Sequence, residues 1–238
     1  MMIKNIYSTG IDLLTEQIEK RKAIRGLSKD ACGDLLDAHL LSLGIIKSIY
    51  TKYLGTPGKT DDSISNRLPL IASFIQGIDI CEICISEGLY TQAAVILKQE
   101  LETVAAIDEC ERGKRKDRKT PNMNCVKLGL NREYGMLNGI GHVSERDIFE
   151  PIYKASPDPN IKGQQPISIL PQFNNELCSY FYAMHILLIL QVIEKLDRLY
   201  FDMYDYKMPK DLKQTLHTII TILEKSKFLI IKTEANDK

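Results

Sequence analysis

The chain lacks an excess of charge of either sign. Its 238 residues include 31 Lys and Arg against 31 Asp and Glu, so the formal net charge is zero. Proteins that bind nucleic acid over their whole surface carry a basic excess, so this class is excluded, although a local basic patch is not. Hydrophobic residues make up 44% of the chain and charged residues 26%, which excludes disorder by composition and is typical of a globular protein.

Long apolar runs are also missing. The N-terminus has no apolar core of the kind that a signal peptide carries. The most apolar stretch, Tyr180–Ile193, is interrupted by His185 and Gln191 and is shorter than the roughly 20 residues that a membrane span needs. We therefore expect a cytoplasmic protein with no membrane partner.

The six cysteines form no dense framework, and Cys81 and Cys84 are the one close pair. Redox pairs of this spacing usually begin a helix after a strand, whereas this pair lies within an apolar helical run. A four-ligand zinc site would need two more ligands, and no second close pair exists. We expect packed, reduced thiols rather than a redox or metal pair, and we expect no cofactor.

Strand patterns are almost absent, whereas apolar periodicity near 3.6 residues recurs along the chain. The sequence therefore predicts an all-α, single-domain bundle of six or seven helices over residues 1–238, with no internal repeat. The expected helices cover about residues 3–22, 34–54, 69–88, 91–112, 131–142, 174–204 and 209–228. The expected irregular parts are a polar break (25–34), a loop (55–62), a basic loop (112–124), a Pro-rich crossing (155–171) and a frayed tail (233–238).

Two of these helices have features that bear on function. The first has one apolar face made by Ile3, Tyr7, Ile11, Leu14 and Ile18. The helix over 174–204 would be roughly 45 Å long, enough to support a whole bundle.

Two carboxylates on the helix over 91–112 differ in their surroundings. Glu100 lies on the apolar stripe of this helix, because its neighbours three, four and seven positions away are mostly apolar. A carboxylate there must be paired or protonated, since burying it bare costs several kcal/mol. Glu102 follows Lys98 by four positions and is expected to form a local pair with it.

The segment over 131–142 carries polar residues at helical spacing. Tyr134, Asn138 and His142 follow one another at four-residue intervals, and Gly135 and Gly139 would allow a neighbouring helix to approach closely. One hypothesis is a catalytic pocket in which Glu100 or Glu102 orients His142 as a general acid or base. The alternative is a structural network that determines how the helices pack.

The basic loop carries six cations, at 112, 114, 115, 116, 118 and 119. It is predicted to be a solvated loop after a helix C-terminus, where cations are favoured. The alternative is an RNA or phosphate contact through Arg115 and Lys116, joined by Lys98, Arg132, Tyr134 and Asn138 as further substrate-binding residues. His185 and His217 lie in apolar helices and are expected to be packed.

Three segments together resemble a group of uncharacterised bacterial all-helical proteins. They are Ser86–Glu102, Thr120–Asn122 and Tyr134–His142, the last reading Tyr-Gly-Met-Leu-Asn-Gly-Ile-Gly-His. That group is distantly similar to HEPN-type helical domains. These are often ribonuclease toxins or accessory subunits in bacterial defence and toxin–antitoxin systems, and many dimerise. The resemblance implies an all-helical fold and such a setting.

The chain departs from the HEPN catalytic motif, which places an Arg four to six residues before a His. The nearest Arg before His142 is Arg132, with nine residues between, and Lys98 stands where the related proteins often have Arg. We therefore expect a non-catalytic interaction or accessory module, a homodimer or the binder of a protein partner. Its partner surface would be the Gly135/Gly139 face or the helix over 174–204. The alternative is a metal-independent ribonuclease that uses His142 with Glu100 or Glu102.

Overall fold

The fold is an all-α bundle, as the sequence predicts. The computed structural model describes residues 2–144, 152–154 and 167–228, and these contain six α-helices, two short 3-10 turns and no strand. The helices are α1 (Met2–Lys52), α2 (Asp62–Ser86), α3 (Tyr90–Glu111), α4 (Tyr134–Gly141), α6 (Asn175–Tyr204) and α7 (Lys210–Lys225). The 3-10 turns are Met123–Cys125 and Leu130–Glu133. Most of the predicted crossing (155–171) and all of the predicted tail (233–238) lie outside the described residues.

Helix α1 corrects the prediction of two helices separated by a polar break. It is one helix with a bend at Cys32, whose backbone is non-helical (φ −124°, ψ 26°). Two polar residues of the predicted break, Arg25 and Ser28, contact the end of α2. Arg25 donates to Glu82 and Glu87, and Ser28 Oγ donates to the Ser86 carbonyl at 2.7 Å. These partners satisfy the Arg25 and Ser28 side chains while the helix continues.

Helix α2 begins earlier than predicted. Asp61 caps its N-terminus by accepting the Ile64 N–H at 2.7 Å, so Pro69, the predicted first residue, lies inside the helix. Pro69 leaves the Ser65 carbonyl without its usual helical donor, but both residues are exposed and water can reach that oxygen. The connection from α2 to α3 turns at Gly88, whose φ is +77°. A Cβ there would lie 2.9 Å from the Gln172 carbonyl oxygen, so the position requires glycine.

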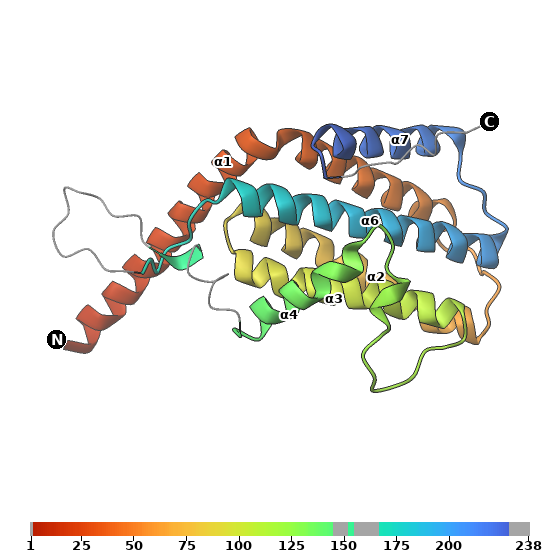
Figure 1. The fold of residues 1–238 in the computed structure, drawn as a ribbon, viewed down its shortest axis with the longest axis horizontal. Coiled ribbons are helices and arrows are strands. Elements are labelled where there is room, and N and C mark those ends of the chain that lie inside the picture. The colour runs from red at the N-terminus through yellow and green to blue at the C-terminus, as the bar shows by residue number, and fades with distance from the viewer. Residues whose placement is uncertain (1, 145–151, 155–166, 229–238) are drawn as a thin grey trace, which may run out of the picture.

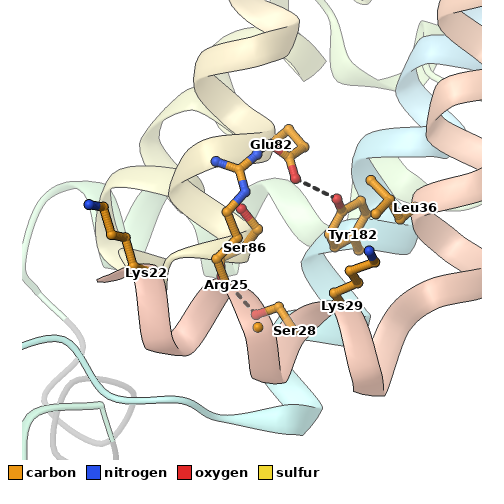
Figure 2. Close-up of a pocket in the computed structure, with 9 residues that line it drawn as sticks. Lys22, Arg25, Ser28, Lys29, Leu36, Glu82, Ser86 and Tyr182 are labelled. Carbon is orange, nitrogen blue, oxygen red and sulfur yellow. Dashed lines mark hydrogen bonds and ion pairs between the residues drawn. The ribbon is translucent and has the colours of Figure 1, made fainter. Parts of the chain in front are cut away.

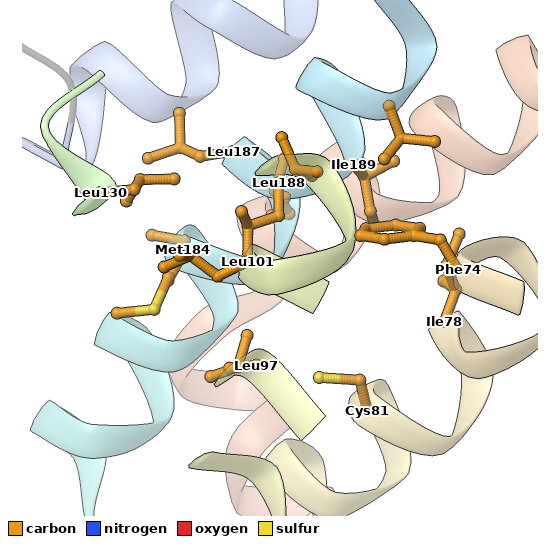
Figure 3. Packing of buried hydrophobic residues seen from close by; sticks show 14 of the residues in the cluster. Phe74, Ile78, Cys81, Leu97, Leu101, Leu130, Met184, Leu187, Leu188 and Ile189 are labelled. Carbon is orange, nitrogen blue, oxygen red and sulfur yellow. The ribbon is translucent and has the colours of Figure 1, made fainter. Parts of the chain in front are cut away.

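Helix α6 is the core of the bundle and packs against α1, α2 and α3 (Figure 1). Figure 3 shows side chains of α2, α3 and α6 meeting in this core, among them Phe74, Leu97 and Leu188. Each large apolar side chain that is fully buried contributes roughly 1.5–3 kcal/mol to stability. Helix α6 buries much of its surface within its own bundle but keeps exposed side chains, Phe201 among them, so the partner surface along this helix stays a prediction.

The first part of α1 extends past the other helices (Figure 1). We call residues 3–18 the α1 arm, and its predicted apolar face, which we call the apolar stripe, is exposed. The exposed fractions of its side chains are 84% for Ile3, 72% for Tyr7, 48% for Ile11, 57% for Leu14 and 36% for Ile18. The predicted amphipathic pattern is therefore present, but no described element covers it.

Helices α2 and α6 are long and apolar enough to cross a membrane when they are judged by length and composition alone. In α6, 72% of the most apolar 18-residue window is buried within the bundle, and in α2 the corresponding share is 39%. The core helix of a soluble protein passes the same test, so this observation is weak. A cytoplasmic location stays a prediction.

Candidate functional site

The basic loop is partly neutralised by the end of α3. Arg112 Nε lies 2.7 Å from Asp108, and Arg115 lies 3.2 Å from Glu109 and donates to the Lys119 carbonyl at 2.9 Å. Lys116 is exposed, and it lines a shallow hollow of about 530 Å³ with Lys114, Arg115 and Lys119. Arg115 is therefore held by the protein itself, whereas Lys114, Lys116 and Lys119 form no ion pair with the part of the chain that the structure describes.

Three of the predicted site residues meet between α3 and α4. Tyr134 Oη donates to Glu102 Oε1 at 2.8 Å, and Lys98 Nζ lies 3.9 Å from the same oxygen. The ammonium of Lys98 also lies 5.8 Å from the centre of the Tyr134 ring. Burial and the hydrogen bond to Glu102 raise the pKa of Tyr134 to about 12, so the phenol stays protonated at neutral pH. The predicted local pair of Lys98 and Glu102 is present, with Tyr134 as its third member.

His142 lies at the opposite end of α4 from this cluster. Tyr134 is beside Glu102, whereas a Cβ on Gly141 would lie 3.6 Å from Val95. The rise of 1.5 Å per residue puts His142 roughly 12 Å along the helix from Tyr134. His142 is exposed, and among the described residues no hydrogen bond or ion pair joins it to Glu100 or Glu102.

The remaining predicted residues of this segment differ in their exposure. Arg132 is exposed in the 3-10 turn before α4, and Asn138 is half-buried, with its carbonyl accepting the His142 N–H. A Cβ on Gly135 would meet nothing within 4 Å, so close helix approach does not explain this glycine. Gly135 is exposed and Gly139 is buried, so the two do not form a single free face.

Glu100 is buried and pairs with a histidine other than His142. Its Oε2 lies 2.9 Å from Nδ1 of His185 on α6, and the two side chains are 4% and 0% exposed. The sequence predicted that this carboxylate needs a partner, and its partner is His185 rather than the His142 of the catalytic hypothesis. The signal available was His185 itself, which interrupts the apolar run of α6. His217, also expected to be packed, is exposed on α7.

Two further residues complete this group, which we call the buried polar centre: Glu100, His185, Cys81 and His39. The ligand atoms of Cys81, Glu100 and His185 all lie within 4.8 Å of one another. The ring of His39 stacks on that of His185 with 5.3 Å between centroids. Burial and the charge of His185 lower the pKa of His39 to about 4, so His39 is neutral at pH 7. Burial, with Glu100 beside it, raises the pKa of the Cys81 thiol.

Polar atoms in the buried polar centre lack partners. Glu100 Oε1, His185 Nε2 and His39 Nδ1 are all buried, and no described residue forms a hydrogen bond with any of them. Thiol, carboxylate and imidazole groups are also the usual ligands of transition metals. Pattern reading along the chain missed this group because its members come from α1, α2, α3 and α6.

A separate hollow of about 340 Å³ lies beside the bend of α1 (Figure 2). Its lining includes Lys22, Arg25, Lys29 and Glu82. Glu82 is occupied, because it accepts hydrogen bonds from Tyr182 Oη at 2.7 Å and from Arg25 at 2.8 Å. Three cations therefore line this hollow together with one carboxylate that already has hydrogen-bond partners.

No known protein family, curated protein or solved structure matches the chain. The functional argument therefore depends on the geometry of the chain itself.

Proposed function

We propose that this chain is a non-catalytic interaction module that forms a homodimer through the apolar stripe of the α1 arm. The observation that carries the proposal is the exposure of Ile3, Tyr7, Ile11, Leu14 and Ile18 along one side of a helix that extends past the bundle. Single exposed apolar residues are ordinary, but a contiguous row of them marks an interaction surface.

The size of the stripe is adequate for a specific contact. If each of its five side chains buries roughly 100 Å² or more, two stripes together bury roughly 1,000 Å², about the lower limit for a specific interface. The formal net charge of zero means that two copies do not repel each other at long range.

The order of residues in the apolar stripe favours a second copy of the chain as the partner that covers it. In an antiparallel pair with its two-fold axis between residues 10 and 11, positions 3 and 7 of one arm lie opposite positions 18 and 14 of the other. Ile3 thus meets Ile18, Tyr7 meets Leu14, and Ile11 faces the small Gly10. A two-fold interface requires this kind of self-complementary surface. The resemblance of residues 86–144 to HEPN-type domains is part of this proposal, because accessory subunits of bacterial defence systems occur among those domains.

The test is the molar mass of the full chain in solution, measured by light scattering over a concentration series. We expect the wild type to have twice its chain mass of 27.1 kDa. Leu14→Glu should weaken association at least tenfold, because it buries a charge in the contact. The control is Ile80→Glu, an equally exposed position on α2, which should stay dimeric. A monomeric wild type at every concentration would refute the proposal.

The ribonuclease alternative has less support, because His142 contacts neither Glu100 nor Glu102. Its test is RNA integrity in bacteria that express the wild type or His142→Ala. We expect intact RNA with both proteins and similar folding by circular dichroism, because the His142 side chain is exposed. RNA degradation by the wild type alone would replace the interaction proposal with a nuclease centred on His142.

A further inference from the structure

The buried polar centre has the composition and the geometry of a metal site. We propose that Cys81, Glu100 and His185 bind one divalent transition-metal ion of the zinc class in the core of the bundle. The proposal is independent of dimer formation, because the three residues lie in the core and the apolar stripe lies on the arm.

The three ligands converge from different helices. Cys81 belongs to α2, Glu100 to α3 and His185 to α6, and these helices pack against one another. In Figure 3 the Cys81 side chain points from α2 toward α3 within the core. Metal sites of helix bundles are built this way, from side chains on facing helices that project inward.

The distances are close to those of a metal site. The ligand atoms lie within 4.8 Å of one another. In a tetrahedral zinc site, with roughly 2.0–2.3 Å from metal to ligand, neighbouring ligand atoms are roughly 3.3–3.8 Å apart. Side-chain shifts of about 1 Å would therefore bring the three atoms to coordinating distance, without movement of the helices.

The unpartnered atoms are a second and independent observation. Glu100 and His185 are 4% and 0% exposed, yet Glu100 Oε1 and His185 Nε2 have no partner among the described residues. A buried polar atom without a partner costs roughly 1–3 kcal/mol, and this cost is rarely tolerated twice in one place. The hydrogen bond between His185 Nδ1 and Glu100 Oε2 leaves Glu100 Oε1 and His185 Nε2 without a partner, and a cation bound between the three side chains would satisfy a lone pair on each of them.

The mixture of ligands selects the class of metal. Ca²⁺ and Mg²⁺ prefer oxygen ligands only, whereas a set of one sulfur, one nitrogen and one oxygen suits Zn²⁺ or Co²⁺. The fourth coordination position is left to water. The ring of His39 on α1 stacks on the ring of His185 and lies outside the set of three ligands. Because the site is closed to solvent, the ion would enter during folding.

The experiment measures metal uptake by the full chain. The protein is unfolded with a chelator, refolded with Co²⁺ or Zn²⁺, and freed of unbound metal. We expect one equivalent of metal in the wild type and, with cobalt, the charge-transfer absorption of a thiolate ligand. Cys81→Ser should lose this absorption and bind at least tenfold more weakly.

Cys84→Ser is the matched control, because Cys84 is also buried on α2 but lies outside the cluster. It should keep both the metal and the absorption. Glu100→Gln is a second ligand variant, decisive if Cys81→Ser does not fold, and it should also bind at least tenfold more weakly. The proposal fails if the refolded wild type retains no metal, or if Cys81→Ser and Cys84→Ser bind alike; the centre is then a network solvated by buried water.

Discussion

At the scale of single residues, buried charges have the highest desolvation cost and therefore most need partners. Lys195 of α6 is 4% exposed, and its ammonium lies 2.9 Å from Asp108 and 2.7 Å from Glu111 at the end of α3. Arg67 of α2 is equally buried and pairs with Asp202 at 2.7 Å. Nothing in the local sequence distinguishes Lys195 from a surface lysine, and only the packing of α6 against α3 gives it this role.

We expect Lys195→Met to destabilise the protein by roughly 1.5–3 kcal/mol, because Asp108 and Glu111 would lose the buried ammonium that they share. Asp108 would keep Arg112, and Glu111 would keep Arg198. The control is Lys127→Met, which breaks an exposed pair with Glu194 and should cost less than about 1 kcal/mol. Urea unfolding of both variants measures the difference. Equal midpoints would show that the Lys195 pairs contribute no more than a surface pair.

The same cluster predicts a dependence of stability on pH. Burial alone would raise the pKa of Asp108, but Lys195 and Arg112 outweigh it and hold the pKa below its ordinary value. A carboxyl whose pKa is lowered by folding stabilises the protein above its unfolded pKa of about 3.9, and this contribution is lost as the pH falls through the folded pKa. The stability difference between wild type and Asp108→Asn should therefore shrink below about pH 4. Urea midpoints between pH 3 and pH 6 measure this, and a constant difference would contradict it.

At the scale of elements, helix caps explain where prediction succeeded and where it failed. The starts of α3 and α6 were predicted to within a residue, because apolar periodicity begins abruptly at Tyr90 and Asn174 caps α6. The start of α2 was wrong because Pro69 is a conspicuous first-turn residue, whereas the cap Asp61 stands in a polar loop that offers several candidates.

Asp61→Ala should destabilise the protein by about 1 kcal/mol, because the Ile64 N–H loses the carboxylate that caps it. Asp62→Ala is the neighbouring control and should cost less, since Asp62 lies within the helix and makes no cap hydrogen bond there. Thermal unfolding followed by circular dichroism measures both variants. A larger loss in Asp62→Ala would mean that the helix begins elsewhere.

At the scale of the whole molecule, the α1 arm is separate from the bundle. Its apolar stripe contributes no residue to the buried core cluster, in which the contribution of α1 begins at Cys32. The arm therefore contributes little to the stability of the single chain, and its exposed stripe is available for association with a second copy.

Deletion of residues 2–18 should leave the unfolding of the bundle unchanged at concentrations where the protein is monomeric, since few core contacts are lost. The same deletion should abolish dimer formation. Thermal unfolding and molar mass measured on one preparation test both expectations. A truncated chain that no longer folds would mean that the arm is part of the core, and a truncated chain that still dimerises would move the interface elsewhere.

The sequence by itself determined the helical class, the position of most helices, the pair of Lys98 and Glu102, and the need of Glu100 for a partner. Each of these follows from contacts three to seven residues apart, which the pitch of a helix sets without further information. Tertiary structure alone decided that His185 rather than His142 meets Glu100, that Cys81 joins them, and that the stripe beginning at Ile3 stays exposed. These outcomes depend on how helices distant in the chain are placed against one another, and residue spacing along the sequence carries no information on that placement.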